Sequence, residues 1–286
     1  MKLFRYGPPG DERPGLLDAH GVRRDLSGVL GDITPHTLGP DALARLARLD
    51  TQRLPEVDPA VRLGPPVGQI GNVLAIGLNY ADHAAEAGLP LPRQPIVFSK
   101  HTAAIAGPHD EVWAPPGAAK LDWEVELAVV IGRSAWHVPE ADALGYVAGY
   151  CLANDVSERA HQLEMDGQWI KGKSYPTHCP LGPWLVTTDE VPDPQAVDLW
   201  LDVNGQPRQR GSTRTMVFGV AYLVSYLSRF MHLLPGDVIL TGTPPGVGMG
   251  HKPPLFLRPG DVVALGGGVL GEQRQRVVAA PLGAAP

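Results

Sequence analysis

The sequence predicts a strand-dominated α+β protein in which a curved or barrel-like sheet carries helices at its periphery. Glycine (34 residues) and proline (30 residues) are dispersed over the 286-residue chain, which favours many short strands and turns over long helices. Short apolar runs between turn residues recur, whereas only one segment is a clear amphipathic helix. Two matched segments, 235–240 and 259–264, each place Pro-Gly-Asp directly before an apolar strand.

The chain divides into two predicted domains, a small N-terminal α/β domain over residues 1–69 and a larger domain over residues 70–286. The first contains a strand, two short strands around a turn, a helix and a proline-rich linker, at residues 2–6, 15–21, 38–49 and 54–67. The larger domain contains strands near residues 73–77, 96–99, 123–131, 147–153, 184–187 and 199–203. Its predicted helices are a short one at 80–88, which a glycine ends, and the amphipathic one at 220–232.

Composition limits the classes of function. Hydrophobic residues make up 44% of the chain and charged residues 19%, which is typical of a globular protein. The formal net charge is -6 without a basic patch, so we expect no nucleic-acid partner. No run approaches the ~18 apolar residues of a membrane span, and the start does not resemble a signal peptide, so we expect a cytoplasmic protein without a membrane partner. Cys151 and Cys179 predict two buried thiols rather than a disulfide framework.

Three acidic residues suggest a metal site. In a strand, Glu124 and Glu126 lie on one face, and the wholly apolar sequence that follows runs into a core. Adjacent carboxylates at the edge of a core repel each other unless a cation or a proton lies between them. Asp155 ends the next predicted strand, and three carboxylates converge if the two strands are neighbours. Oxygen ligands suit Mg²⁺, Mn²⁺ or Ca²⁺. The alternative for Glu124 and Glu126 is a solvated face of an edge strand.

Other polar residues have a functional and a structural interpretation. Tyr80, His83 and Glu86 share one helical face, where Glu86 could orient His83 as a general base. The alternative is a surface helix with an ordinary salt bridge. Arg159 could bind a substrate carboxylate through two hydrogen bonds, or it could pair with Asp155 one turn earlier.

Two loops are further candidates. Residues 167–174 match the P-loop expression, but no buried strand precedes them and Pro176 prevents a helix from following, so we reject a phosphate-binding loop. Gln168 and Lys173 remain candidate substrate contacts in this loop. In the glycine-rich segment 241–250, Thr243 could hydrogen-bond a carboxylate, and the alternative is a tight structural loop.

In their order along the chain, five motifs resemble those of the fumarylacetoacetate hydrolase family. They are Gly77-Leu-Asn-Tyr-Ala-Asp-His-Ala-Ala-Glu86, Trp123-Glu-Val-Glu-Leu127, Asn154-Asp-Val-Ser-Glu-Arg159, Gly172-Lys-Ser174 and Thr241-Gly-Thr-Pro-Pro-Gly-Val-Gly248. The N-terminal unit and the segments 211–218 and 271–277 resemble the subgroup labelled ureidoglycolate lyase. That subgroup includes hydrolases of 2,4-diketo-3-deoxy sugar acids such as the L-rhamnonate and L-fuconate derivatives.

This resemblance implies a mixed β-sandwich roll as the catalytic domain, a Mg²⁺ or Mn²⁺ ion and a homodimer. By motif match, the metal ligands are Glu124, Glu126 and Asp155. The catalytic residues are His83 and Glu86 on a lid helix. Lys173 is a further catalytic residue, because it would contact the substrate and stabilise oxyanion charge. The other substrate contacts implied by the match are Tyr80, Arg159, Gln168 and Thr243.

The implied reaction is hydrolysis of a C–C bond in a 2,4-diketo acid, either an acylpyruvate or a diketo-deoxy sugar acid, to pyruvate and a second acid. His83 would activate water to attack the C4 carbonyl, and the cation would act as a Lewis acid. The same chemistry allows decarboxylation of oxaloacetate or isomerisation of 2-hydroxyhepta-2,4-diene-1,7-dioate. A ureidoglycolate lyase fits less well, because its substrate lacks the α-keto chelate. An alternative of another class is a non-catalytic protein that binds keto acids.

Overall fold

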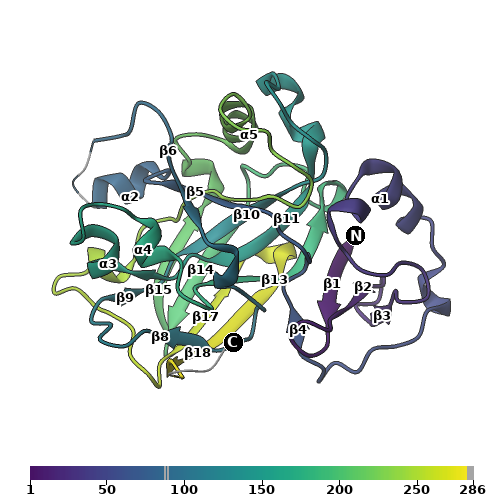
Figure 1. Cartoon of the computed structure of the whole chain (residues 1–286), viewed down its shortest axis with the longest axis horizontal. Coiled ribbons are helices and arrows are strands. Elements are labelled where there is room, and N and C mark those ends of the chain that lie inside the picture. Colours follow the sequence, from purple (N-terminus) through teal and green to yellow (C-terminus); the bar gives the residue numbers. More distant parts are fainter. Residues whose placement is uncertain (87, 89, 282–286) are drawn as a thin grey trace.

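A computed structural model gives the architecture, and it confirms a strand-dominated fold of mixed sheets with few helices (Figure 1). The structure describes residues 1–86, 88 and 90–281, and the side chain of His83 lies outside this description. Helices α2, α3 and α4 gather at one end of the molecule, and α1 lies at the opposite end (Figure 1). The helices are α1 (Pro40–Leu46), α2 (Ala81–Glu86), α3 (Arg159–Leu163), α4 (Ile170–Lys173) and α5 (Val220–Ser228).

The main sheet has eleven strands, and nine of them follow the order β3-β2-β1-β13-β11-β10-β16-β5-β6, with β4 paired to β1 and β7 paired to β13. Its middle strands β10 and β11 are buried on both faces and mostly apolar, which is the pattern of strands that are covered on both sides. The strands are β1 (Lys2–Tyr6), β2 (Arg13–Leu17), β3 (Arg23–Asp25), β4 (Leu63–Gly64), β5 (Val73–Gly77), β6 (Ile96–Lys100), β7 (Ile105–Ala106), β10 (Val125–Ile131), β11 (Val147–Asn154), β13 (Cys179–Thr187) and β16 (Val238–Leu240).

A second sheet of five strands follows the order β15-β14-β17-β18-β8, and a short pair joins β9 to β12. Along β14, buried side chains alternate with more exposed ones, as expected of a sheet with one covered face. The strands are β8 (Val112–Ala114), β9 (Leu121–Asp122), β12 (Ser157–Glu158), β14 (Asp198–Val203), β15 (Gln206–Ser212), β17 (Val262–Gly266) and β18 (Glu272–Ala279).

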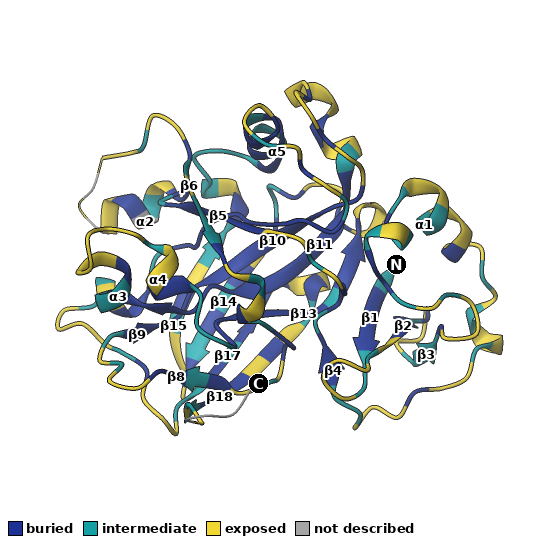
Figure 2. Ribbon diagram, in the orientation of Figure 1, coloured by how far each residue is buried: buried dark blue, intermediate teal, exposed yellow. Residues whose placement is uncertain are grey.

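Two apolar clusters lie on the two faces of the main sheet, and β10 contributes to both. Val125, Leu127 and Val129 belong to the cluster that also contains side chains of the second sheet and of α5. Ala128 and Val130 belong to the other cluster. The period-two geometry of a strand explains this division. Buried strands therefore run through the middle of the molecule, while the outer faces of the helices are exposed (Figure 2).

The N-terminal unit continues the main sheet. Lys2 and Leu3 of β1 pair antiparallel with Val186 and Leu185 of β13, so the sheet runs across the predicted boundary between residues 69 and 70. Leu3 also belongs to the second apolar cluster together with residues of β11 and β13. The position of that boundary stays a prediction.

Several element ends differ from the sequence prediction. Strand β13 begins at Cys179, well before residue 184, although Pro180 and Pro183 ordinarily argue against a central strand. Helix α5 ends at Ser228 rather than at residue 232, because the chain then turns to form an isolated bridge between Leu233 and Ala135.

Both cysteines are free and buried, as predicted. Within the described ranges, no helix has the length and apolar character needed to cross a membrane.

Candidate metal centre

Glu126 lies in strand β10 and Glu124 directly precedes it, and the alternation of the chain directs both to the same face of the main sheet. The two residues alternate with Trp123 and Val125, which belong to the apolar cluster that also contains side chains of the second sheet and of α5. Both acidic residues are buried, with 6% and 2% of their surface exposed. β10 lies between β11 and β16, so the alternative of a solvated edge strand is wrong.

Asp155 joins the two glutamates because β11 is the antiparallel neighbour of β10. Val125 lies opposite Asn154, and the amide of Asp155 donates to the carbonyl of Glu124 at 2.9 Å. Each of the three carboxylates offers an oxygen atom, and these atoms lie within 4.8 Å of one another. The predicted convergence of Glu124, Glu126 and Asp155 is therefore present in the structure.

Three buried cations surround two of the carboxylates. Lys173 Nζ lies 2.7 Å from both Glu124 Oε2 and Asp155 Oδ2. Arg159 Nη2 donates to Glu124 Oε1 at 2.6 Å, and its Nε donates to Asp122 Oδ2 at 2.8 Å. Lys100 Nζ donates to Asp155 Oδ1 and to a backbone carbonyl. The ion pairs of Arg159 are thus with Asp122 and Glu124 and not with Asp155.

The pKa values of the two glutamates move in opposite directions. Burial would raise the pKa of Glu124, but Arg159 and Lys173 together hold it well below its ordinary range. Burial raises the pKa of Glu126 well above its ordinary value, and the negative charges of Asp155 and Glu124 raise it further. No lysine or arginine among the described residues forms an ion pair with Glu126, whose hydrogen bond comes from the amide of Gly242 at 2.8 Å.

The environment of Glu126 tests whether a cation fits between the three carboxylates. A buried carboxylate is costly unless it is paired or coordinates a metal ion. Its two carboxylate neighbours complete an all-oxygen donor set, which is the set that hard divalent cations prefer. The residues present therefore fit a divalent cation held by Glu124, Glu126 and Asp155.

A pocket of about 150 Å³ opens beside Glu124 and Glu126. Its polar side also includes Arg159, Lys173 and Thr243. Gln162 is also part of the polar lining, and the remaining side chains form an apolar wall that consists of Ile76, Leu78, Phe98, Leu163, Trp169 and Met249. The pocket thus combines an ionic floor with an apolar wall.

The predicted substrate contacts differ in their positions. Thr243 lines the pocket, but its hydroxyl already donates to the carbonyl of Val125 at 2.9 Å and accepts from Gln209 at 2.8 Å. Gln168 is exposed and lines a neighbouring surface pocket instead. Tyr80 is fully buried, and its hydroxyl makes no hydrogen bond of ordinary geometry to the described residues. Burial and the nearby Glu126 raise the pKa of Tyr80 well above 10.0.

Helix α2 carries the predicted catalytic pair. The carboxylate of Glu86 accepts from the amide of Gly246, with its two oxygens 3.1 and 3.0 Å from that nitrogen. His83 lies in α2, but its side chain is outside the described residues, so the His83–Glu86 pair remains a prediction.

Three polar residues of the site were not predicted. Lys100 is buried at the end of β6, where a lysine after an apolar strand was the available signal. Gln162 accepts from Arg159 Nη1 at 3.0 Å and lines the pocket, and its position three residues after Arg159 on a helix could have indicated it. Asp122 also accepts from the amides of Gly248 and of Met249, a contact that no local pattern predicts.

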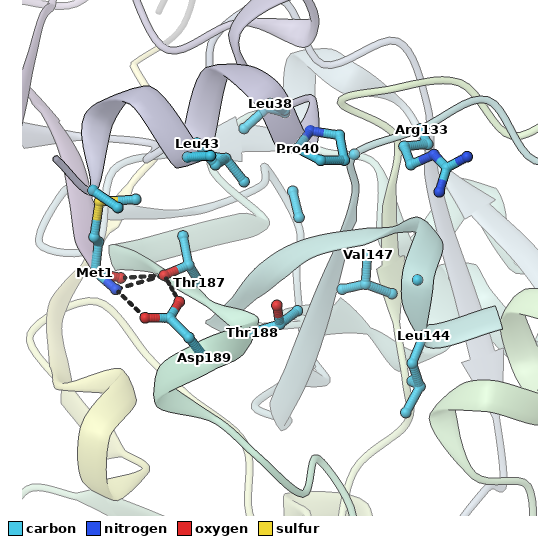
Figure 3. A pocket seen from close by; sticks show the side chains of 15 residues that line it. Met1, Leu38, Pro40, Leu43, Arg133, Leu144, Val147, Thr187, Thr188 and Asp189 are labelled. Carbon is cyan, nitrogen blue, oxygen red and sulfur yellow. Dashed lines mark hydrogen bonds and ion pairs between the residues drawn. The ribbon is translucent and has the colours of Figure 1, made fainter. Parts of the chain in front are cut away.

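A second pocket, of about 340 Å³, lies between α1 and the ends of β11 and β13 (Figure 3). Figure 3 shows Leu43 on one side of it and Val147 on the other. The backbone nitrogen of Met1 donates to Thr187 Oγ1 at 2.5 Å beside it. It shares no lining residue with the carboxylate pocket.

Comparison with known proteins decides the family. The family model described as fumarylacetoacetate (FAA) hydrolase C-terminal matches residues 72–278 of the chain. The chain belongs to the fumarylacetoacetate hydrolase family. A relative from Burkholderia multivorans, whose name is only a generic hydrolase name, is 59% identical over 281 residues, covering 98% of this chain and 100% of that protein. Membership confirms the family predicted from the motifs and makes the chain an enzyme of hydrolase or lyase type.

Solved structures of the family have the same fold. A fumarylacetoacetate hydrolase from Exiguobacterium antarcticum is 36% identical with a TM-score of 0.85. A maleylpyruvate hydrolase from Sphingobium sp. SYK-6, solved with manganese(II) and pyruvate, is 29% identical with a TM-score of 0.82. For both, the match covers 98% of this chain and 100% of the other. A 2-hydroxyhepta-2,4-diene-1,7-dioate isomerase from Mycobacterium marinum is 32% identical with a TM-score of 0.76, covering 98% of each chain.

Proposed function

We propose that this protein is a divalent-metal-dependent hydrolase that cleaves a C–C bond in a 2,4-diketo acid and releases pyruvate and a second acid. The observation that carries the proposal is the convergence of Glu124, Glu126 and Asp155 beside a pocket that both glutamates line together with Lys173 and Arg159. Lys173, Arg159 and a bound metal ion carry positive charge, which favours an anionic substrate that binds to the metal ion. Both acylpyruvates and the diketo-deoxy sugar acids of the resembling subgroup belong to this substrate class.

Mg²⁺ is the proposed cation and Mn²⁺ is the alternative, supported by the manganese in the related maleylpyruvate hydrolase structure. Glu124, Glu126 and Asp155 would hold it. When bound, a divalent cation supplies Lewis acidity toward the 2-keto acid end of the substrate.

The residues of the chain would position the substrate and stabilise charge. An ammonium has three N–H donors, and Lys173 uses two of them on Glu124 and Asp155, so one remains for a substrate oxygen. That donor would stabilise the negative charge that develops when water attacks the C4 carbonyl. We propose His83 as the base that removes the proton from this water, with Glu86 orienting the imidazole. Arg159 holds Glu124 and Gln162 in place.

Isomerisation of a 2-hydroxy-dienedioate is the second candidate, because the Mycobacterium marinum isomerase has the same fold over the whole chain. Oxaloacetate decarboxylation uses the same site chemistry. A non-catalytic keto-acid-binding protein and a ureidoglycolate lyase remain weaker alternatives. A homodimer is also proposed, and sedimentation or light scattering in solution would test it.

The experiment is a turnover assay on protein treated with a chelator and then supplied with Mg²⁺ or Mn²⁺. We expect pyruvate release from 2,4-diketo acids only with metal, and a loss of at least about 100-fold in kcat for His83→Ala, as for removal of a general base. Metal-dependent decarboxylation or isomerisation without pyruvate release from any diketo acid would overturn the proposal. Oxalate binding without turnover of any keto acid would indicate the binding protein instead.

A further inference from the structure

We infer that the part of the substrate beyond the 2-keto acid end is an uncharged apolar acyl group, and that Trp169 is the main residue that selects it. This inference rests on the proposed function. Three types of substrate share the keto-acid end: alkyl or aryl acylpyruvates, dicarboxylates and polyhydroxylated sugar acids. The inference favours the acylpyruvates over the other two.

The charges of the cations that line the pocket are already balanced by carboxylates of the protein. Arg159 forms ion pairs with both Asp122 and Glu124, and it also donates to Gln162. Lys173 pairs with Glu124 and Asp155, and its one remaining donor is the one proposed for the C4 carbonyl oxygen. Among the described residues that line the pocket, no further cation is available to pair with a second carboxylate.

The apolar wall of the pocket is the largest surface that it offers to the rest of the substrate. It consists of Ile76, Leu78, Phe98, Leu163, Trp169 and Met249. Leu163 and Met249 are 43% and 40% exposed, and an apolar ligand would cover this surface. Hydroxyl groups placed against this wall would lose their hydrogen bonds to water without gaining partners from it.

Trp169 is held in the wall by two specific contacts. Its ring packs edge-on against Phe98, with the ring centroids 5.2 Å apart. On its other side it lies against the backbone of Gly77, where a Cβ atom would come within 2.5 Å of the indole ring. The absence of a side chain at Gly77 therefore allows the indole to reach this position. Phe98 in turn lies 5.1 Å from Lys173 Nζ, which joins the apolar wall to the ionic floor.

The size of the pocket places the acyl group at the rim. A cavity of about 150 Å³ holds one molecule the size of benzene, which has six heavy atoms. The pyruvate end of the substrate also has six heavy atoms and fills a space of that order. The acyl group therefore extends past Trp169 toward Leu163 and Met249.

The test compares three substrates in the metal-loaded enzyme: 2,4-dioxoheptanoate, 2,4-dioxoheptanedioate and a 2,4-diketo-3-deoxy sugar acid. The first two have the same carbon chain and differ by a terminal carboxylate. We expect kcat/KM to be at least about 10-fold higher for 2,4-dioxoheptanoate than for either of the others. Trp169→Ala should reduce this ratio about 5-fold or more, whereas Trp169→Phe should largely retain it. The exposed Trp136, which lies outside the pocket lining, provides the matched control Trp136→Ala.

Each outcome decides one of the two claims. A preference for the dicarboxylate or the sugar acid would overturn the inference while the proposed hydrolase function stands. An unchanged ratio in a folded Trp169→Ala protein, with folding checked by thermal unfolding, would overturn the role of Trp169. Pyruvate release from none of the three substrates would overturn both the proposed function and the inference.

Discussion

Buried lysines determine how the carboxylates of this site are held. Asp155 accepts hydrogen bonds from both Lys100 and Lys173, and all three side chains are almost completely buried. Removal of one partner from a buried ion pair leaves the other charge without compensation, which costs more than the intact pair contributes. Lys100 does not line the pocket, so its effect on Asp155 can be measured separately from substrate binding.

Lys100→Met should lower the free energy of unfolding by about 3–5 kcal/mol, because Asp155 Oδ1 loses its cation in a buried site. Urea unfolding at neutral pH measures this. Lys120→Met is the matched control, since Lys120 pairs with Glu164 at the surface, where the two side chains are 39% and 57% exposed. That change should cost about 0–1 kcal/mol. Equal losses in the two variants would contradict this account of Asp155.

His178 provides a pH prediction. Burial and then the positive charge of Lys100 lower the pKa of His178 to about 3. Between about pH 3 and its unfolded pKa of about 6.5, the unfolded chain binds a proton that the folded chain does not. The contribution of His178 to stability is therefore lost as the pH falls below about 6.5, by at most about 1.4 kcal/mol per pH unit.

We expect His178→Gln to make the decline in stability between pH 6.5 and 4.5 less steep than in the wild type. Urea unfolding at several pH values measures the slope, and His36→Gln, at an exposed histidine, is the control. Identical slopes in wild type and His178→Gln would contradict a lowered pKa of His178 in the folded protein.

At the scale of elements, the loop after β16 supplies a backbone amide that donates a hydrogen bond to Glu126. Gly242 donates its amide to Glu126 Oε2 with a φ of 93°, a left-handed conformation that favours glycine. A Cβ at this position would lie 2.9 Å from Asn79 Cβ and 3.1 Å from the Ile76 carbonyl. The side chain of Asn79 is itself fixed by hydrogen bonds to two backbone carbonyls, so it cannot easily move aside.

Gly242→Ala should therefore weaken metal binding about 10-fold or more, because the donor to Glu126 is displaced. Calorimetric titration with Mn²⁺ measures the affinity. Gly260→Ala is the matched control: its φ is 104°, but a Cβ there would meet nothing within 4 Å. Both variants should lose about 1–3 kcal/mol of stability through backbone strain. A similar loss of metal affinity in both would refute a specific role for Gly242.

The same elements show which parts of the site the sequence predicts. The alternation around Glu124 and Glu126 predicts their common face because strand geometry is local. The position of Asp155 followed from two consecutive strands, which are often neighbours. In contrast, the contacts of Lys100 with Asp155 and of Asp122 with residue 248 depend on chain segments far apart, whose approach no local pattern encodes.

Local irregularity limited the prediction in other places. Strand β13 lies in the middle of the main sheet, but the prolines in its first half are not typical of a central strand, so that half was not predicted. The α3–α4 segment folds so that Gln162 lines the pocket while Gln168 faces outward, and both lie near Arg159 in sequence. Sequence proximity therefore identified the correct segment but not the glutamine that lines the pocket.

At the scale of the whole molecule, the N-terminal unit and the rest of the chain share one sheet and one apolar cluster. Strand β1 covers the edge of β13, and Leu16, Leu26 and Ile33 belong to the cluster that also contains Leu185. An uncovered strand edge with apolar residues beside it is prone to intermolecular pairing.

A chain that consists of residues 70–286 alone should therefore aggregate or unfold at markedly lower temperature than the full chain. Size-exclusion chromatography with light scattering and thermal unfolding measure these properties. A monodisperse product with an unfolding temperature like that of the full chain would instead show that residues 70–286 fold independently of residues 1–69.

The claim on which the account depends is that Glu124, Glu126 and Asp155 hold a divalent cation, and titration of chelator-treated protein with Mn²⁺ tests it most directly. We predict that one ion binds per chain. In Glu126→Gln the affinity should be at least about 100-fold lower, because this change removes a metal ligand itself and not a residue that only hydrogen-bonds to a ligand. Glu164→Gln, at an exposed glutamate, should bind as the wild type does. Absence of binding to the wild-type protein, or equal affinity in Glu126→Gln, would contradict the metal centre.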